Sequence, residues 1–327
     1  MRMFDLIKKL TDAFGVSGNE EKVRDVIKAE ISGLLDEIYV DALGNLIGVK
    51  KGPGRKVMVA AHMDEIGVMA NYIDEKGFIR FSSIGWVSPH FALGQRVRFE
   101  NGTLGAVFYE EKLEDMKGLK LSGLYIDIGA GSKEEAEKII KIGDTACFTG
   151  DATQQRDFIT SKALDNRSGC AVLVETVKNL PPTDNEIYFV FTVQEELGMR
   201  GAKTSAYHIK PDYAIAVDVT LTGDTPECKP MEVKCGGGPA IKIKDRSVIC
   251  HQEVKRLLED RAQKAGIPVQ YEILDAGGTD AGAIHLTAGG IPSGVISIPC
   301  RYVHSPVETA SLKDIRNAVR LLTESIV

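Results

Sequence analysis

The sequence predicts an α/β fold in which a mixed, mostly parallel sheet is flanked by helices and carries a small inserted β-rich domain. Continuous apolar runs, such as VMVAAH at 57–62 and IYFVFTV at 187–193, alternate with helical patterns near both ends of the chain. Their lack of polar alternation is typical of strands covered on both faces. Between them, residues 67–159 carry short alternating segments separated by Gly, Asn and Asp, which indicates a separate β-rich unit.

The first 66 residues predict helices, a hairpin and a buried strand. Residues 3–35 place apolar side chains at helical spacing, with a helix start signal at 17–20. A hairpin is expected to pair 38–40 with 46–49, across a turn that contains Gly and Asn. The run at 57–62 then forms a strand that ends at His62.

The middle part of the chain is expected to contain mainly strands, and the last part to alternate between helices and strands. The inserted domain is expected to have one helix at 133–140 and strands at 78–81, 96–100, 104–110, 124–129 and 145–150. After Ser161 the alternation resumes, with helices at 168–180, 254–265 and 311–326 and strands at 187–193, 213–219 and 293–298. We therefore expect residues 1–66 and 160–327 to form one domain, interrupted by residues 67–159.

Composition narrows the class of protein. The chain has 327 residues, 43% of them hydrophobic, which is enough for a substantial core. Its formal charge of −6, without a dense Lys/Arg block, argues against a nucleic-acid partner. No apolar run approaches the length of a membrane span. Six cysteines without CxxC spacing predict reduced thiols and a cytoplasmic location.

Five potential metal ligands lie at the ends of apolar runs: His62, Asp165, Glu196, Asp218 and His304. Taken singly, such a residue is more often a capping or surface group. However, strand ends in an open α/β sheet share one ligand-binding edge, so these residues can converge there. A set of imidazoles and carboxylates without thiolates suits zinc, cobalt or manganese. Together they indicate two divalent cations and a water, and hence hydrolysis.

Several motifs carry a resemblance to a known family. They are His62-Met63-Asp64, ALDNRSG at 163–169, QEELG at 194–198, the strand end at Asp218, GGTDA at 277–281 and PCRYVHSP at 299–306. In order and spacing they resemble the dinuclear-metal aminopeptidases of the glutamyl aminopeptidase and cellulase M family, the tetrahedral or TET-type peptidases. The resemblance extends from the first predicted helix to the last.

The resemblance implies a role for each residue of the candidate site. Asp165 would bridge two metal ions, with His62 and Asp218 at one ion and Glu196 and His304 at the other. Glu195, the neighbour of Glu196, would be the catalytic general base acting on a hydroxide shared by the ions. Three carboxylates and one hydroxide would balance two divalent cations. The family favours zinc or cobalt over manganese, and it implies a cis peptide bond between Asp165 and Asn166.

The resemblance also implies a substrate and an assembly. We expect the enzyme to remove amino-terminal residues from short peptides. Its subunits would associate as dimers into a tetrahedral homododecamer, with residues 67–159 forming a β-barrel-like dimerisation or oligomerisation domain. Neither nucleic acid nor membrane is an expected partner.

Some roles stay open at the sequence level. Asp64 is expected to accept the second N–H of His62 and fix its tautomer, although Asp is also common in turns. Arg301 is compatible with a substrate contact or a structural salt bridge. Trp86 is compatible with a subunit contact, but we favour the core of the inserted domain. A deacylase or carboxypeptidase is the alternative to an aminopeptidase, and an endoglucanase or a non-catalytic binding protein is a weaker one.

Overall fold

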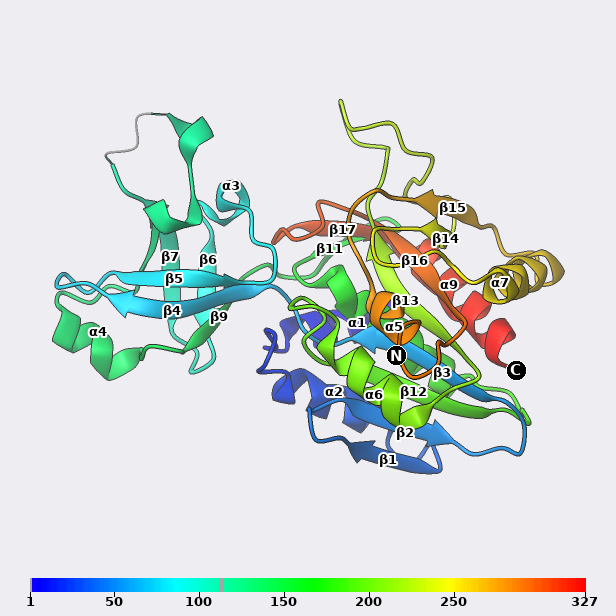
Figure 1. Cartoon of the computed structure of the whole chain (residues 1–327). Helices are drawn as coiled ribbons and strands as arrows, with labels where there is room; N and C mark the ends of the chain where they lie inside the picture. The colour runs from blue at the N-terminus through cyan, green and yellow to red at the C-terminus, as the bar shows by residue number, and fades with distance from the viewer. Residues whose placement is uncertain (1, 112–114) are drawn as a thin grey trace.

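The computed structural model describes residues 2–111 and 115–327, and its fold confirms the predicted class. A mixed sheet covered by helices forms an α/β body, and a small closed β-barrel projects from it at the left of Figure 1. Both termini lie in the body.

The body is built on a sheet of eleven strands with the order β1-β2-β12-β3-β13-β16-β17-β11-β10, to which β14 and β15 attach beside β16. The strands are β1 (Glu37–Val40), β2 (Leu46–Lys50), β3 (Lys56–His62), β10 (Thr153–Gln155), β11 (Phe158–Ser161), β12 (Glu186–Thr192), β13 (Tyr213–Thr220), β14 (Ala240–Lys244), β15 (Gln270–Ile273), β16 (Ser293–Arg301) and β17 (Glu308–Ser311). The four central strands β12, β3, β13 and β16 are parallel, so their carboxyl ends share one edge.

Helices cover both faces of this sheet, which explains the continuous apolar strands. Along β3, Val57 and Val59 pack into the larger core, whereas Met58 and Ala60 pack into a second core on the opposite face. The larger core lies under α1 (Met3–Asp12), α2 (Glu21–Ile31), α5 (Leu164–Lys178), α7 (Gln252–Lys264) and α9 (Leu312–Ile326). The second lies under α6 (Arg200–Ile209) and α8 (Asp280–Ile284).

The barrel closes in the order β4-β5-β8-β7-β6-β9 around a core of its own. Its strands are β4 (Gly67–Ile73), β5 (Ile79–Ile84), β6 (Arg96–Phe99), β7 (Leu104–Tyr109), β8 (Leu124–Asp127) and β9 (Thr145–Phe148). Its helical segments are α3 (Pro89–Ala92), η1 (Met116–Gly118), η2 (Leu121–Gly123) and α4 (Lys133–Ile139). Because a closed barrel has no free strand edge, the insertion has its own complete pairing.

The two chain crossings between body and barrel are joined by buried charges. Glu65, between β3 and β4, accepts hydrogen bonds from Lys162 Nζ at 2.6 and 2.8 Å. Lys162 lies in the body between β11 and α5, and its N–H donates to the carbonyl of Gly150 on the returning crossing between β9 and β10. Arg167 of α5 also contacts Glu65, at 3.2 Å, and donates to the carbonyls of Leu10 and Met63. These contacts fix where the barrel leaves the body.

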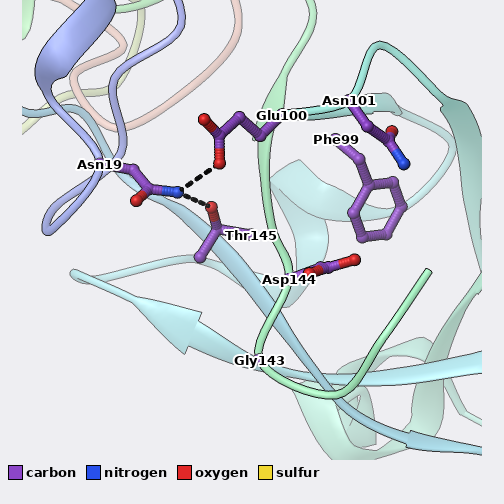
Figure 2. A pocket seen from close by; sticks show the side chains of 7 residues that line it. All are labelled: Asn19, Phe99, Glu100, Asn101, Gly143, Asp144 and Thr145. Atoms are coloured by element: carbon purple, nitrogen blue, oxygen red, sulfur yellow. Dashed lines mark hydrogen bonds between the residues drawn. The ribbon is translucent and has the colours of Figure 1, made fainter.

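A second junction contact comes from the loop between α1 and α2. The Asn19 amide donates to Glu100 Oε2 and to Thr145 Oγ1 of the barrel, both at 3.0 Å (Figure 2). These residues line a pocket of about 340 Å³ at the junction. None of the five candidate ligands lines this pocket, so it is separate from the candidate site.

The structure contains elements that the sequence patterns did not predict. Helix α6, helix α8 and strands β14, β15 and β17 are short or carry polar and glycine-rich sequences, so their periodicity is weak. Helix α5 begins at Leu164, four residues before the predicted start, and residues Asp165 and Asn166 within it have non-helical backbone angles. The peptide bond between these two residues is cis, as the resemblance implied.

No helix in the described parts of the chain is both long and apolar enough to cross a membrane. All six cysteines are free.

Candidate metal centre

The candidate ligands converge at the carboxyl edge of the parallel strands. His62 is the last residue of β3, Asp218 lies near the end of β13, and His304 follows β16 by three residues. Glu196 follows β12, and Asp165 lies in the first turn of α5. The ends of four strands and the start of one helix thus bring together residues that are up to 242 positions apart in the sequence.

Asp165 stands at the centre of two overlapping groups. In the first, His62 Nε2 lies 3.1 Å from Asp165 Oδ1 and 3.6 Å from Asp218 Oδ1. In the second, His304 Nε2 lies 3.3 Å from Asp165 Oδ2 and 3.2 Å from Glu196 Oε1. Within each group the ligand atoms are all within 4.8 Å of one another. One carboxylate therefore presents one oxygen to each group.

The electrostatics of both groups favour positive charge at their centres. Burial would lower the pKa of His62 and of His304, but the surrounding carboxylates raise both well above the usual range. Burial would raise the pKa of Asp165, but hydrogen bonds from the two imidazoles lower it. A divalent cation in each group would supply this positive charge, and the donors are those that zinc, cobalt and manganese accept. The residues therefore fit a pair of metal ions.

Glu195 lies beside the two groups and lines the cleft. Its pKa is raised well above the usual range, first by burial and then by the nearby charges of Asp218, Glu196 and Asp280, although His62 opposes the shift. A carboxylate with a raised pKa holds a proton more readily, which suits a group that accepts and then donates one.

Asp64 contacts the site with both its backbone carbonyl and its carboxylate. His62 Nδ1 lies 3.1 Å from the Asp64 carbonyl oxygen and 3.5 Å from its carboxylate, so the closer partner is the carbonyl. The Asp64 carboxylate accepts the N–H groups of Glu195 at 3.0 Å and Glu196 at 3.1 Å, and the Ser17 hydroxyl at 2.6 Å. Asp64 thus orients the segment that carries both glutamates.

A cleft of about 920 Å³ opens over the two groups. Apart from the candidate ligands and Glu195, its walls include Leu221, Leu274, Val303, Arg246 and Thr279. Trp86 also lines it, with its ring 5.9 Å from that of His304 and 65% of its surface exposed. The preference for Trp86 as barrel core was therefore wrong, because the residue follows β5 on a connection that faces the body.

Two other residues from the motifs have structural partners. Arg301 forms a two-pronged salt bridge with Asp224, at 3.0 and 2.6 Å, and does not line the cleft. Asp280 accepts a hydrogen bond from the Thr192 hydroxyl at 2.5 Å. The Thr279 hydroxyl oxygen is buried without a hydrogen-bond partner in the described structure.

The sequence patterns missed Glu308, which contacts the backbone of two candidate ligands. Its only sequence signal is its place four residues after His304, and an acid at that distance is common in turns. Glu65 and Lys162 were missed as well, because their pairing joins chain segments 97 residues apart.

The parallel edge of this mixed α/β sheet carries two three-ligand groups that share one carboxylate, an arrangement that could hold two metal ions. The comparison with known sequences places the chain more narrowly. Residues 44–321 match the model of the M42 glutamyl aminopeptidase family, and the chain belongs to that family. It is accordingly an enzyme of the peptidase class, as the motifs indicated.

Individual relatives agree over nearly their whole length. The chain is 70% identical over 324 residues to a protein from Acetivibrio thermocellus, covering 99% of this chain and 98% of the relative. Among solved structures, aminopeptidase APDkam598 from Desulfurococcus kamchatkensis is 41% identical with a TM-score of 0.95, covering 99% and 94% of the two chains. The TET1 peptidase of Pyrococcus horikoshii, which can assemble into a tetrahedron or an octahedral shell, is 34% identical with a TM-score of 0.91, and 99% of each chain is covered.

Proposed function

We propose that this chain is a metal-dependent aminopeptidase that removes amino-terminal residues from short peptides. The observation that carries the proposal is the shared carboxylate of Asp165, with one oxygen toward His62 and the other toward His304. Membership of the M42 family supports cleavage at the amino terminus. The cleft volume of about 920 Å³ is that of a small-molecule site, which suits short peptides.

In this proposal His62, Asp165 and Asp218 hold one cation, and Asp165, Glu196 and His304 hold the other. When bound, a metal pair lowers the pKa of a water and stabilises negative charge on the substrate carbonyl oxygen. Glu195 accepts the proton of the attacking water and delivers it to the nitrogen of the leaving amine. Zinc or cobalt is the favoured metal, and manganese is the alternative.

The experiment combines metal removal with a substrate panel. Purified enzyme is treated with a chelator, and zinc, cobalt or manganese is then restored separately. We expect activity on aminoacyl-anilides and free short peptides to disappear and return with metal, while N-blocked peptides and carboxymethyl cellulose stay uncleaved. Full activity in the metal-free enzyme would contradict the metal requirement. Equal cleavage of N-blocked peptides would favour a deacylase or endopeptidase.

We further propose that residues 1–66 and 160–327, together with β10 and the start of β11, form the catalytic domain, and that the barrel within residues 67–159 is a domain for subunit contacts. Exposed apolar residues on the barrel, including Met69, Leu104 and Phe108, support a contact surface there. A tetrahedral homododecamer built from dimers is the proposed assembly, supported by the likeness to a TET1 peptidase. The six free cysteines support a cytoplasmic location.

A further inference from the structure

We propose that Glu308 is a positioning residue that fixes the backbone of two metal ligands, Asp165 and His304, and thereby sets the geometry of the second metal group. This inference rests on the proposed metal-dependent function. Glu308 acts on the backbone of the ligands: its carboxylate accepts their N–H groups and, within the parts of the chain that the structure describes, makes no hydrogen bond with a ligand side chain.

One carboxylate connects two separate chain segments. Glu308 is the first residue of β17 and is only 2% exposed. Its Oε2 accepts the N–H of Asp165 at 2.9 Å, and its Oε1 accepts the N–H of His304 at 2.8 Å. Asp165 begins α5 and His304 lies in the connection after β16, so the two ligands share an anchor although 139 residues separate them.

Neither N–H group has a place in a regular hydrogen-bond ladder. Asp165 has φ −80° and ψ 102°, outside the helical region, and it follows closely on Ala163, whose φ is +55°. His304 itself has φ +64°, a left-handed conformation that is rare for a residue with a side chain. A buried N–H without an acceptor is costly, so each of these two groups needs one. The Glu308 carboxylate therefore accepts hydrogen bonds from both N–H groups and stabilises an uncommon backbone conformation at the two ligands.

The backbone of the second ligand group is held by the carboxylates of two residues, Asp64 and Glu308. Asp64 accepts the N–H of Glu196, and Glu308 accepts the N–H groups of Asp165 and His304, so every ligand of the second group has its backbone anchored by a carboxylate. In the first group, Asp165 is the one ligand that also belongs to the second group and is therefore anchored by Glu308. Loss of Glu308 should consequently weaken the second metal position more than the first.

The test measures metal binding directly. Glu308→Gln keeps the size of the side chain, but its amide nitrogen would face one of the two N–H donors. Apo protein is titrated with Co²⁺, followed by visible absorption and by bound metal after equilibrium dialysis. We expect two equivalents in the unmodified protein, and in E308Q one equivalent weakened about 10- to 100-fold, with an altered cobalt spectrum.

Asp314→Asn is the matched control. Asp314 is also buried, and its carboxylate accepts the N–H groups of Gly236 at 2.6 Å and Gly238 at 2.9 Å, away from the ligand groups. It should lose stability as E308Q does while keeping both metal affinities and the cobalt spectrum.

Each outcome bears on a different claim. Two unchanged affinities and an unchanged spectrum in E308Q would overturn the positioning role. Equal weakening in D314N would do the same, because the effect would then be general destabilisation. If E308Q does not fold, Glu308→Asp keeps the charge but shortens the reach to both N–H groups, and the same titration decides. An unmodified protein that binds no metal would instead contradict the proposed function.

Discussion

At the scale of single residues, Glu195 and Glu196 are neighbours with different surroundings. Glu196 Oε1 lies 3.2 Å from His304 Nε2, whereas Glu195 belongs to neither three-ligand group. Their N–H groups are both held by Asp64, so the separation arises from the directions of the two side chains. One side chain can then bind a cation while the other stays available for proton transfer.

Glu195→Gln should lower kcat about 10²- to 10⁴-fold, because the amide cannot accept a proton from water. Both metal equivalents should remain, since Glu195 belongs to neither three-ligand group. Glu196→Gln is the comparison, and it should lose affinity for one metal. Peptidase rates and metal content are measured in parallel. Near-normal turnover in metal-loaded E195Q would remove Glu195 from the mechanism.

Residue types and strand ends pointed to five candidate ligands in the sequence, because parallel strands bring their carboxyl ends together, and the resemblance to a known family added a role for Glu195. The position of Trp86 could not be inferred in this way. Its exposure depends on how the barrel is oriented against the body, and no local pattern encodes that orientation. Glu308 was not identified from the sequence for a similar reason, since its partners are backbone groups that every residue except proline possesses.

At the scale of elements, the buried central strands and the edge hairpin β1–β2 were predictable, and several other peripheral strands were not. Strands β3, β12, β13 and β16 are apolar on both faces, so their sequences are distinctive. Strand β10 has three exposed residues and β15 alternates only partly, so their pairing depends on neighbours rather than on their own composition.

The ion pair between Glu65 and Lys162 should contribute strongly to the stability of the junction. Lys162→Met should cost about 3 kcal/mol of unfolding free energy, the lower end for breaking a buried pair, because Arg167 still faces Glu65. Urea unfolding measures the change. Lys255→Met is the control, since it breaks the partly exposed pair with Glu259 and should change the stability much less. Equal losses in both variants would contradict a special role for the junction.

At the scale of the whole molecule, the barrel presents apolar side chains outward. Leu104 and Phe108 alternate along β7 with buried Gly105 and Val107, and both are about half exposed. A row of exposed apolar side chains on a barrel is typical of an interaction surface, which agrees with the proposed subunit contact.

Light scattering should give a mass near twelve times the 35.5 kDa of the chain. The double substitution Leu104→Glu and Phe108→Glu should reduce that mass, because it places charges in the proposed contact. Leu286→Glu, at an exposed apolar position on the body, is the matched control and should leave the mass unchanged. If light scattering gives the mass of one subunit at all protein concentrations, the proposed dodecamer is wrong. If the double variant keeps the twelvefold mass, the subunits contact each other through a different surface.

The salt bridge between Glu65 and Lys162 also bears on how the family can diversify. It joins two positions that are 97 residues apart in the sequence, one before the barrel and one after it. The entropy of closing a loop grows slowly with its length, by about 0.6 kcal/mol for each doubling. Insertions and deletions within the barrel would therefore change the closure entropy little, and His62 and Asp165 would remain adjacent. New surfaces could evolve on the barrel while the hydrolytic chemistry stays the same.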